Sequence, residues 1–127
     1  MKAKIIQRAG IDSIDAIVEI EGVRYLARDR LNQNIREGDT ENISFSIALA
    51  NDYETVETII SGNKNNETKL EHISGTKYRA YGKVLSTSPL TVDCGITTFR
   101  NVFPHKDNNL VGQFIEFEIL ILNAHSA

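Results

Sequence analysis

The chain has one cysteine, two prolines and no tryptophan, and it lacks any long apolar run. A single cysteine cannot form an internal disulfide bond, which is typical of proteins in a reducing compartment. A membrane-spanning helix needs about 18 or more consecutive apolar residues, and the sequence contains no such stretch. The N-terminal segment MKAKIIQRAG also lacks the apolar core of a secretory signal. These absences predict a cytoplasmic protein.

Sequence motifs for metal, nucleotide or nucleophile chemistry are missing as well. The single cysteine and the three histidines show neither C-x-x-C nor H-x-x-x-H spacing, so no metal site is expected. The chain has no phosphate-binding loop, no dinucleotide fingerprint, no Ser-x-x-Lys and no nucleophile elbow. The sequence therefore predicts no cofactor, no metal and no enzymatic activity.

The formal net charge of −3 is spread unevenly along the 127 residues. Residues 12–57 hold eleven acids and four bases, for a net charge of −7, whereas residues 1–11 contribute +3 and residues 58–127 contribute +1. Such a concentration of acids suits either a plain solvated surface or a face that attracts a basic partner.

The most apolar stretch, residues 114–122, alternates as a β-strand does. One face is wholly apolar and must be covered, whereas the opposite face carries two glutamates at its start. The apolar face consists of Ile115, Phe117, Ile119 and Ile121. Residues 43–49 repeat the pattern I-x-F-x-I-x-L, so we expect two equivalent core strands.

Shorter alternating segments, separated by turn residues, occupy much of the remaining chain. They lie at residues 3–8, 14–21, 23–28, 78–86, 90–94 and 96–101. This spacing predicts a single all-β domain over residues 1–127, or a mainly β domain with one or two short helices, built as an antiparallel barrel or sandwich.

The strands fall into two meander units, at about residues 3–50 and 78–123, which share a loose correspondence compatible with an internal duplication. The connector, residues 51–77, is polar. Within it, residues 52–61 favour a helix slightly over a strand, and residues 69–73 suit one helical turn. A second short helical turn is expected over residues 29–37, because Leu31 and Ile35 lie four residues apart.

The meander with its closing strand VGQFIEFEIL resembles a five-stranded oligonucleotide-binding (OB) barrel, so the fold is expected to be partly OB-like. That resemblance implies nucleic-acid binding as an alternative function. Aromatic residues available for base stacking would be Tyr25, Tyr78, Tyr81 and Phe99. The overall acidity argues against this alternative, because affinity for phosphate depends chiefly on cations.

Individual reactive side chains favour structural roles. Cys94 shares a strand face with apolar residues and is expected to be a buried thiol. Glu116 and Glu118 are expected to pair with basic side chains across the sheet. His125 lies in a C-terminal tail that is expected to fray.

We therefore expect a non-enzymatic protein-binding module, most simply an immunity or antitoxin-type inhibitor that neutralises a basic toxin such as a nuclease. Acidic groups would steer association and block the groove that holds phosphates. Nucleic-acid binding and membership of a larger assembly are the alternatives. The expected partner-binding residues are acids near loops of the first unit and in the connector: Asp12, Asp15, Glu37, Asp39, Glu41, Asp52 and Glu54.

Overall fold

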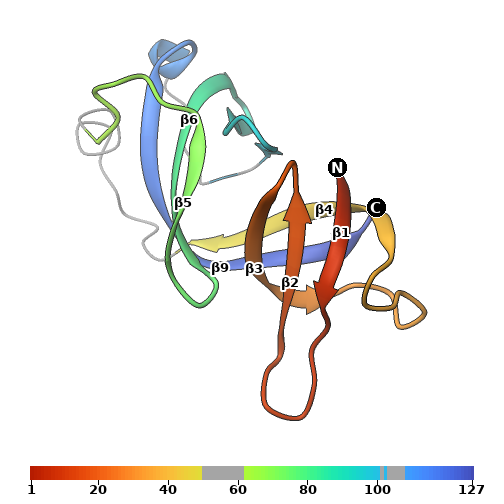
Figure 1. Ribbon diagram of the computed structural model, residues 1–127. Helices are drawn as coiled ribbons and strands as arrows, with labels where there is room; N and C mark the ends of the chain where they lie inside the picture. Colours follow the sequence, from red (N-terminus) through yellow and green to blue (C-terminus); the bar gives the residue numbers. More distant parts are fainter. Residues whose placement is uncertain (50–61, 101, 103–107) are drawn as a thin grey trace.

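One sheet of nine strands joins the whole described chain in the computed structural model, which describes residues 1–49, 62–100, 102 and 108–127 (Figure 1). The strands are β1 (Lys2–Gln7), β2 (Asp15–Ile20), β3 (Val23–Arg30), β4 (Thr40–Leu49), β5 (Lys69–Ser74), β6 (Lys77–Thr87), β7 (Leu90–Asp93), β8 (Thr98–Phe99) and β9 (Phe114–Ser126). A single 3₁₀ turn, η1 (Asn108–Leu110), precedes β9. The described residues contain no α-helix, and hence no helix long and apolar enough to cross a membrane. The all-β fold class is confirmed.

Five strands form a closed ring in the order β1–β2–β3–β9–β4, with β4 returning to β1. All of these pairings are antiparallel except β3 with β9, which are parallel. The ring, which we define as β1–β4 with residues 119–126 of β9, is the OB-like barrel expected from the sequence. The ring is closed by two short pairings of three residue pairs each, β1 with β4 and β3 with β9.

The second lobe consists of β5–β8 and residues 114–119 of β9. Strand β6 pairs with this first part of β9, β5 and β7 flank β6, and β8 pairs with β7. Strand β9 thus runs through both regions (Figure 1). The two units expected from the sequence share this strand, and their origin by duplication stays a prediction.

A β-bulge reverses the faces of β9 as the strand passes from the second lobe into the ring. The register with β4 shifts between Ala48 and Leu49, where Ala48 faces Ile121 and Leu49 faces Ile119. Ile119 is buried, but Leu122 rather than Ile121 is the next buried side chain. The expectation of one continuous apolar face ending in Ile121 is therefore wrong.

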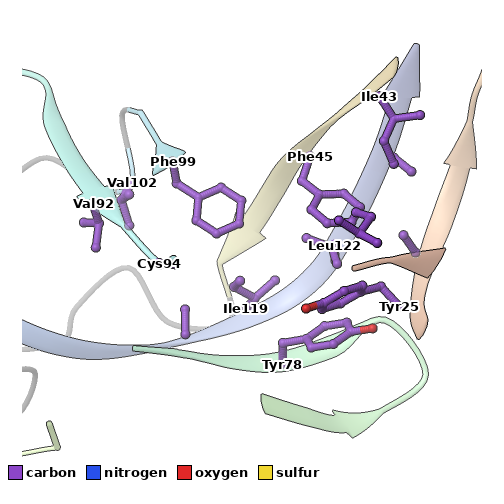
Figure 2. Close-up of a cluster of buried hydrophobic side chains, with 14 of the residues drawn as sticks. Tyr25, Ile43, Phe45, Tyr78, Val92, Cys94, Phe99, Val102, Ile119 and Leu122 are labelled. Atoms are coloured by element: carbon purple, nitrogen blue, oxygen red, sulfur yellow. The ribbon is translucent and has the colours of Figure 1, made fainter. Parts of the chain in front are cut away.

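The buried side chains form one cluster that spans the ring and the second lobe (Figure 2). Tyr25 and Phe45 meet edge to face with ring centroids 5.8 Å apart. Tyr78 lies next to Tyr25, and its hydroxyl donates to the carbonyl oxygen of Leu26 (2.9 Å) and accepts from the Leu26 N–H (2.8 Å). Burial raises the pKa of Tyr78 to about 12. This hydroxyl thus bonds both backbone groups of Leu26, on a side of β3 where no described strand pairs with that residue.

Both helical turns expected from the sequence are absent. Residues 69–73 lie in β5, which pairs with β6. Residues 29–37 contain the end of β3 and irregular turns, although Leu31 and Ile35 are both buried as the helical spacing required. The expected tight turn at Glu21-Gly22 is confirmed, with φ of 52° and 80° at the two residues. The helix expected at 52–61 lies outside the described residues.

Candidate partner-binding surface

Two loops lie together at one end of the ring, and we call residues 8–14 and 31–39 the loop end. The first loop joins β1 to β2 and extends beyond the barrel (Figure 1). The second joins β3 to β4, and its Glu37 Oε1 accepts a hydrogen bond from the Arg8 backbone N–H (3.0 Å). An open cleft of about 360 Å³ lies between the loops, and Asp12 and Glu37 both line it.

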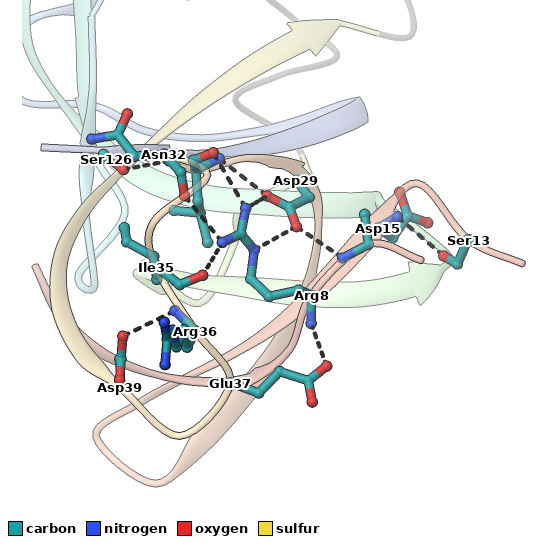
Figure 3. Close-up of polar contacts among 12 residues, drawn as sticks. Arg8, Ser13, Asp15, Asp29, Asn32, Ile35, Arg36, Glu37, Asp39 and Ser126 are labelled. Carbon is teal, nitrogen blue, oxygen red and sulfur yellow. Dashed lines mark hydrogen bonds and ion pairs between the residues drawn. The ribbon is translucent and has the colours of Figure 1, made fainter. Parts of the chain in front are cut away.

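Arg8 locks the two loops into one unit (Figure 3). Its Nε and Nη2 donate to the two carboxylate oxygens of Asp29, at 2.8 and 3.1 Å. The same guanidinium also donates to the carbonyl oxygens of Leu31 (3.3 Å), Asn32 (3.0 Å) and Ile35. One planar cation therefore holds the irregular chain after β3 in place of a helix.

Asp29 completes this anchor from the other side. Its carboxylate accepts hydrogen bonds from the backbone N–H groups of Ala9 (2.8 Å) and Leu31 (3.1 Å). Burial by itself raises the pKa of Asp29, but the hydrogen bonds from Arg8, Ala9 and Leu31 and the charge of Arg8 outweigh it, so the pKa is lowered. Asp29 is thus ionised and structural, and sequence reasoning gave it no role.

The structure brings the predicted acids of the first unit to the loop end or its margin. Asp12 is exposed beside the tip of the first loop, and Glu37 is exposed across the cleft. Asp39 is half-buried, and its Oδ2 accepts from the Arg36 N–H (2.9 Å). Glu41 is half-buried on β4, opposite Ala3 of β1.

Asp15 differs from these acids because it lies at the start of β2 on the outer face of the sheet. Its Oδ1 is buried without a hydrogen-bond partner among the described residues, as is Nε of Arg28, its cross-strand neighbour. The remaining predicted residues, Asp52 and Glu54, lie outside the described part of the chain.

Two exposed isoleucines accompany the acids. Ile11, at the tip of the first loop, is fully exposed (105%), and Ile14 is 60% exposed. Sequence reasoning placed Ile11 in a turn and Ile14 at the start of the strand expected at residues 14–21, and it gave neither a binding role. Their signal was present, because β-branched apolar residues in a loop rich in Gly, Asp and Ser serve no turn purpose.

The acids of the loop end lack ion-pair partners. Within the described ranges, Asp12, Glu37 and Asp39 form no ion pair with a lysine or arginine, and neither does Glu41. The second lobe shows the opposite. Glu116 pairs with Arg79 and Glu118 with Lys77 (3.4 Å), which confirms the expected cross-strand pairing. The loop end therefore holds three acids without an ion pair among the described residues, Asp12, Glu37 and Asp39, together with the exposed Arg36.

No other side chains in the described segments assemble into a reactive centre. Cys94 is a buried thiol, as expected; burial, followed by the charge of Asp93, raises its pKa to about 12. His72 Nε2 contacts the Gly75 carbonyl oxygen (2.8 Å), and His125, which lies in β9 rather than in a frayed tail, contacts Ser46 Oγ (2.7 Å). The described residues contain no group of three or more side chains that could hold a metal ion.

The aromatic platform proposed for base stacking does not form. Tyr25, Tyr78 and Phe99 are buried in the core, with exposures of 7%, 1% and 3%. Tyr81 is half-buried on the second lobe, where the ammonium of Lys69 lies 5.1 Å from its ring centroid. Three of the four aromatic residues are therefore unavailable to a nucleic-acid strand.

Comparison of the chain with protein-family models, with curated proteins and with solved structures found no match.

Proposed function

We propose that this protein is a non-enzymatic protein-binding module that docks a basic partner through the loop end. The observation that carries the proposal is the contrast in charge pairing. Asp12, Glu37, Asp39 and Glu41 form no ion pair with the described residues, whereas acids of the second lobe do. Unpaired surface carboxylates in one region create a field that steers a cationic partner.

Ile11 and Ile14 supply the apolar contact that charge alone does not provide. Binding energy concentrates in a few desolvated anchors surrounded by polar groups. Ile11 adjoins Asp12 at the tip of the loop, so an apolar anchor and an acid enter the interface together. The Arg8–Asp29 pair orders the loops before binding, which lowers the entropy cost of association.

The most specific form of the proposal is an immunity or antitoxin-type inhibitor that neutralises a basic toxin, such as a nuclease, in the cytoplasm. A nuclease must bind phosphates with cationic side chains, and a projecting loop with carboxylates complements such a groove. Inhibition requires only that the loop occupy the groove, so the inhibitor needs no catalytic group of its own.

The proposal is tested by affinity capture from a nuclease-treated lysate of the native host, at salt concentrations from about 50 to about 500 mM. The expected result is capture of a basic protein whose recovery falls as salt rises. Recovery that is independent of salt, or capture of an acidic protein, would overturn electrostatic docking. Capture of nucleic acid from an untreated lysate, without a protein, would favour the OB-like alternative.

Variants then locate the interface with the purified partner. Asp12→Asn combined with Glu37→Gln is expected to weaken binding at low salt, and Ile11→Ser to weaken it by about 2 kcal/mol or more at any salt. The matched controls lie at the opposite end of β2, where Glu21 and Val23 are also exposed. Glu21→Gln and Val23→Ser are expected to bind as the wild type does.

A further inference from the structure

A second cleft, of about 330 Å³, lies between β4 and β8, where the ring meets the second lobe. One wall consists of Phe45, Ser46 and Ile47, and the other of Thr98, Phe99 and Arg100. Phe45 and Phe99 belong to the same core cluster, and Figure 2 shows them on the two strands that border the cleft. The cleft is separate from the loop end and shares no lining residue with it.

The β4 wall carries backbone groups that point into the cleft. The Ala127 N–H donates to the Asn42 carbonyl oxygen, so the even-numbered residues of β4 exchange hydrogen bonds with β9. The backbone groups of Ile43 point to the opposite edge of β4, away from β9, and its N–H donates to the Met1 carbonyl oxygen. Beyond Met1, the N–H and C=O groups of Phe45 and Ile47 lie on this same edge and face β8.

The β8 wall has the same property. The Cys94 N–H donates to the Thr97 carbonyl oxygen, and Val92 lies opposite Phe99, so the odd-numbered residues of β8 pair with β7. The backbone groups of Thr98 therefore point away from β7 on the side that lines the cleft. Among the described residues, no backbone hydrogen bond joins β4 to β8.

Two strand edges that pair with no described strand on this side thus border one cleft. An unpaired backbone edge is a template for an added strand, because its N–H and C=O groups repeat at a fixed spacing. Arg100 adds a charge preference. It is exposed, it forms no ion pair within the described ranges, and none of the described residues that line the cleft is an acid.

We propose that the β4–β8 cleft binds an extended peptide segment that carries an acidic side chain. The backbone of the peptide pairs with the cleft-facing groups of β4 or β8, and its carboxylate pairs with Arg100. The cleft prefers an acidic peptide, whereas the loop end prefers a basic partner. Because the two sites are separate and do not compete for the same partner, both can be occupied together. This inference does not depend on the proposed function.

The probe is a phage-displayed library of random linear peptides, selected against the full chain. The expected result is enrichment of peptides that contain Asp or Glu. In residue-resolved hydrogen exchange, the amides of Phe45, Ile47 and Thr98 should exchange fast in the free protein. An enriched peptide should slow exchange of amides within this group and leave the loop end unchanged.

Proline substitution separates backbone pairing from side-chain contact. Thr98→Pro removes an N–H that faces the cleft and leaves the Cys94–Thr97 hydrogen bond intact, whereas Thr98→Ala keeps the N–H and removes only the side chain. We expect Thr98→Pro to weaken peptide binding about tenfold or more and Thr98→Ala to weaken it far less. Arg100→Gln, which leaves the backbone untouched, should abolish the preference for acidic peptides.

Several outcomes would overturn the proposal. The first is that no peptide is enriched, and the second is that enriched peptides protect amides elsewhere in the chain. A third is that the three amides are already protected in the free protein, which would mean that the two edges are covered. Enriched peptides without acidic residues, or equal binding by Arg100→Gln, would overturn the assignment to an acidic segment.

Discussion

The ring and the second lobe differ in what their carboxylates contact. In the second lobe, Lys69 lies between Glu67 and Glu71 at 3.2 and 3.3 Å, and the two glutamates of β9 are also paired. In the ring, the paired acids are Asp29, which is buried, and Glu19, which pairs with Arg24 at 3.3 Å. The acids of the loop end remain unpaired. In the lobe, two of these acids join β9 to β6 and two pair within β5 or just before it, whereas the acids of the loop end form no ion pair with the described residues.

The boundary between the two regions gives the largest expected effect. Leu122 is buried in the ring just past the bulge, whereas Leu120 is 47% exposed. Leu122→Ala is expected to cost about 2–5 kcal/mol of unfolding free energy, and Leu120→Ala less than about 1 kcal/mol. Both variants replace a leucine with alanine, so their unfolding free energies, measured by urea denaturation, can be compared directly. Equal costs would show that the face of β9 does not reverse.

The anchor of the ring comes next. Asp29→Asn removes the charge that holds Arg8 and weakens hydrogen bonds to a charged group, so a loss of about 1.5–3 kcal/mol is expected. Glu19→Gln, which affects the exposed pair with Arg24, should cost less than about 1 kcal/mol. The same denaturation assay compares the two variants. Equal costs would place Asp29 among ordinary surface acids.

Acid titration sharpens the same test. The pKa of Asp29 lies below its ordinary value of 3.8 in the folded state. Its ionised form therefore stabilises the fold above that value, and this stability is lost as the pH falls through 3.8 toward the lower folded pKa. Between about pH 5 and about pH 2, the wild type should lose more stability than Asp29→Asn. Parallel pH profiles would contradict the lowered pKa.

Close packing around a glycine in the second lobe gives a loss of unfolding free energy that is expected to equal that of Asp29→Asn or to be smaller. A Cβ added at Gly82 would lie 2.5 Å from the Asp93 carbonyl oxygen and 2.9 Å from Sγ of Cys94, whereas one at Gly10 meets nothing within 4 Å. Gly82→Ala is expected to cost about 1–3 kcal/mol through overpacking. Gly10→Ala serves as the matched control and should change the thermal midpoint little. A neutral Gly82→Ala would mean that β6 and β7 can separate without loss.

The smallest effect compares the two classes of acid directly. Glu116→Gln breaks the pair with Arg79 and is expected to cost about 0.2–1 kcal/mol, less at high salt. Glu41→Gln removes a charge without an ion-pair partner in the described chain and should cost nothing or stabilise slightly. A larger cost for Glu41→Gln would show that this acid supports the ring instead of remaining free.

Side-chain alternation was sufficient to predict most strands and the buried thiol. Strands β2 and β4 alternate throughout and β6 alternates as far as Leu85, and the burial of Cys94 follows from its place on the same face as Val92. Strand β5 escaped prediction because KLEHIS has a single half-buried residue, Leu70, among exposed ones. Its stability comes from pairing with β6, which leaves no periodic signal in its own sequence.

The site was predicted only in part. The acids of the loop end were chosen from charge and loop position, and the topology brings them together. The role of Arg8 depends on contacts with residues more than twenty positions away, which local spacing does not encode. Leu31 and Ile35 have helical spacing and both are buried, but they do not lie in a helix. Arg8 instead binds the carbonyl oxygens of both residues and holds this segment in an irregular conformation. The bulge at Leu120 of β9 lies within a run of four apolar residues, 119–122, which does not show which of them face the core.

The order of the strands along the chain has a consequence for biosynthesis. Strands β1–β4 precede the second lobe, but the ring is completed by β9, which follows it. During translation, the first four strands therefore leave the ribosome before β9 exists. The edges of β3 and β4 that pair with β9 stay unpaired until that strand has been translated. Long-range closure of this kind is slow, and open strand edges invite mispairing between nascent chains. Production of the protein should accordingly be more sensitive to damage in the C-terminal strand than to changes in any loop.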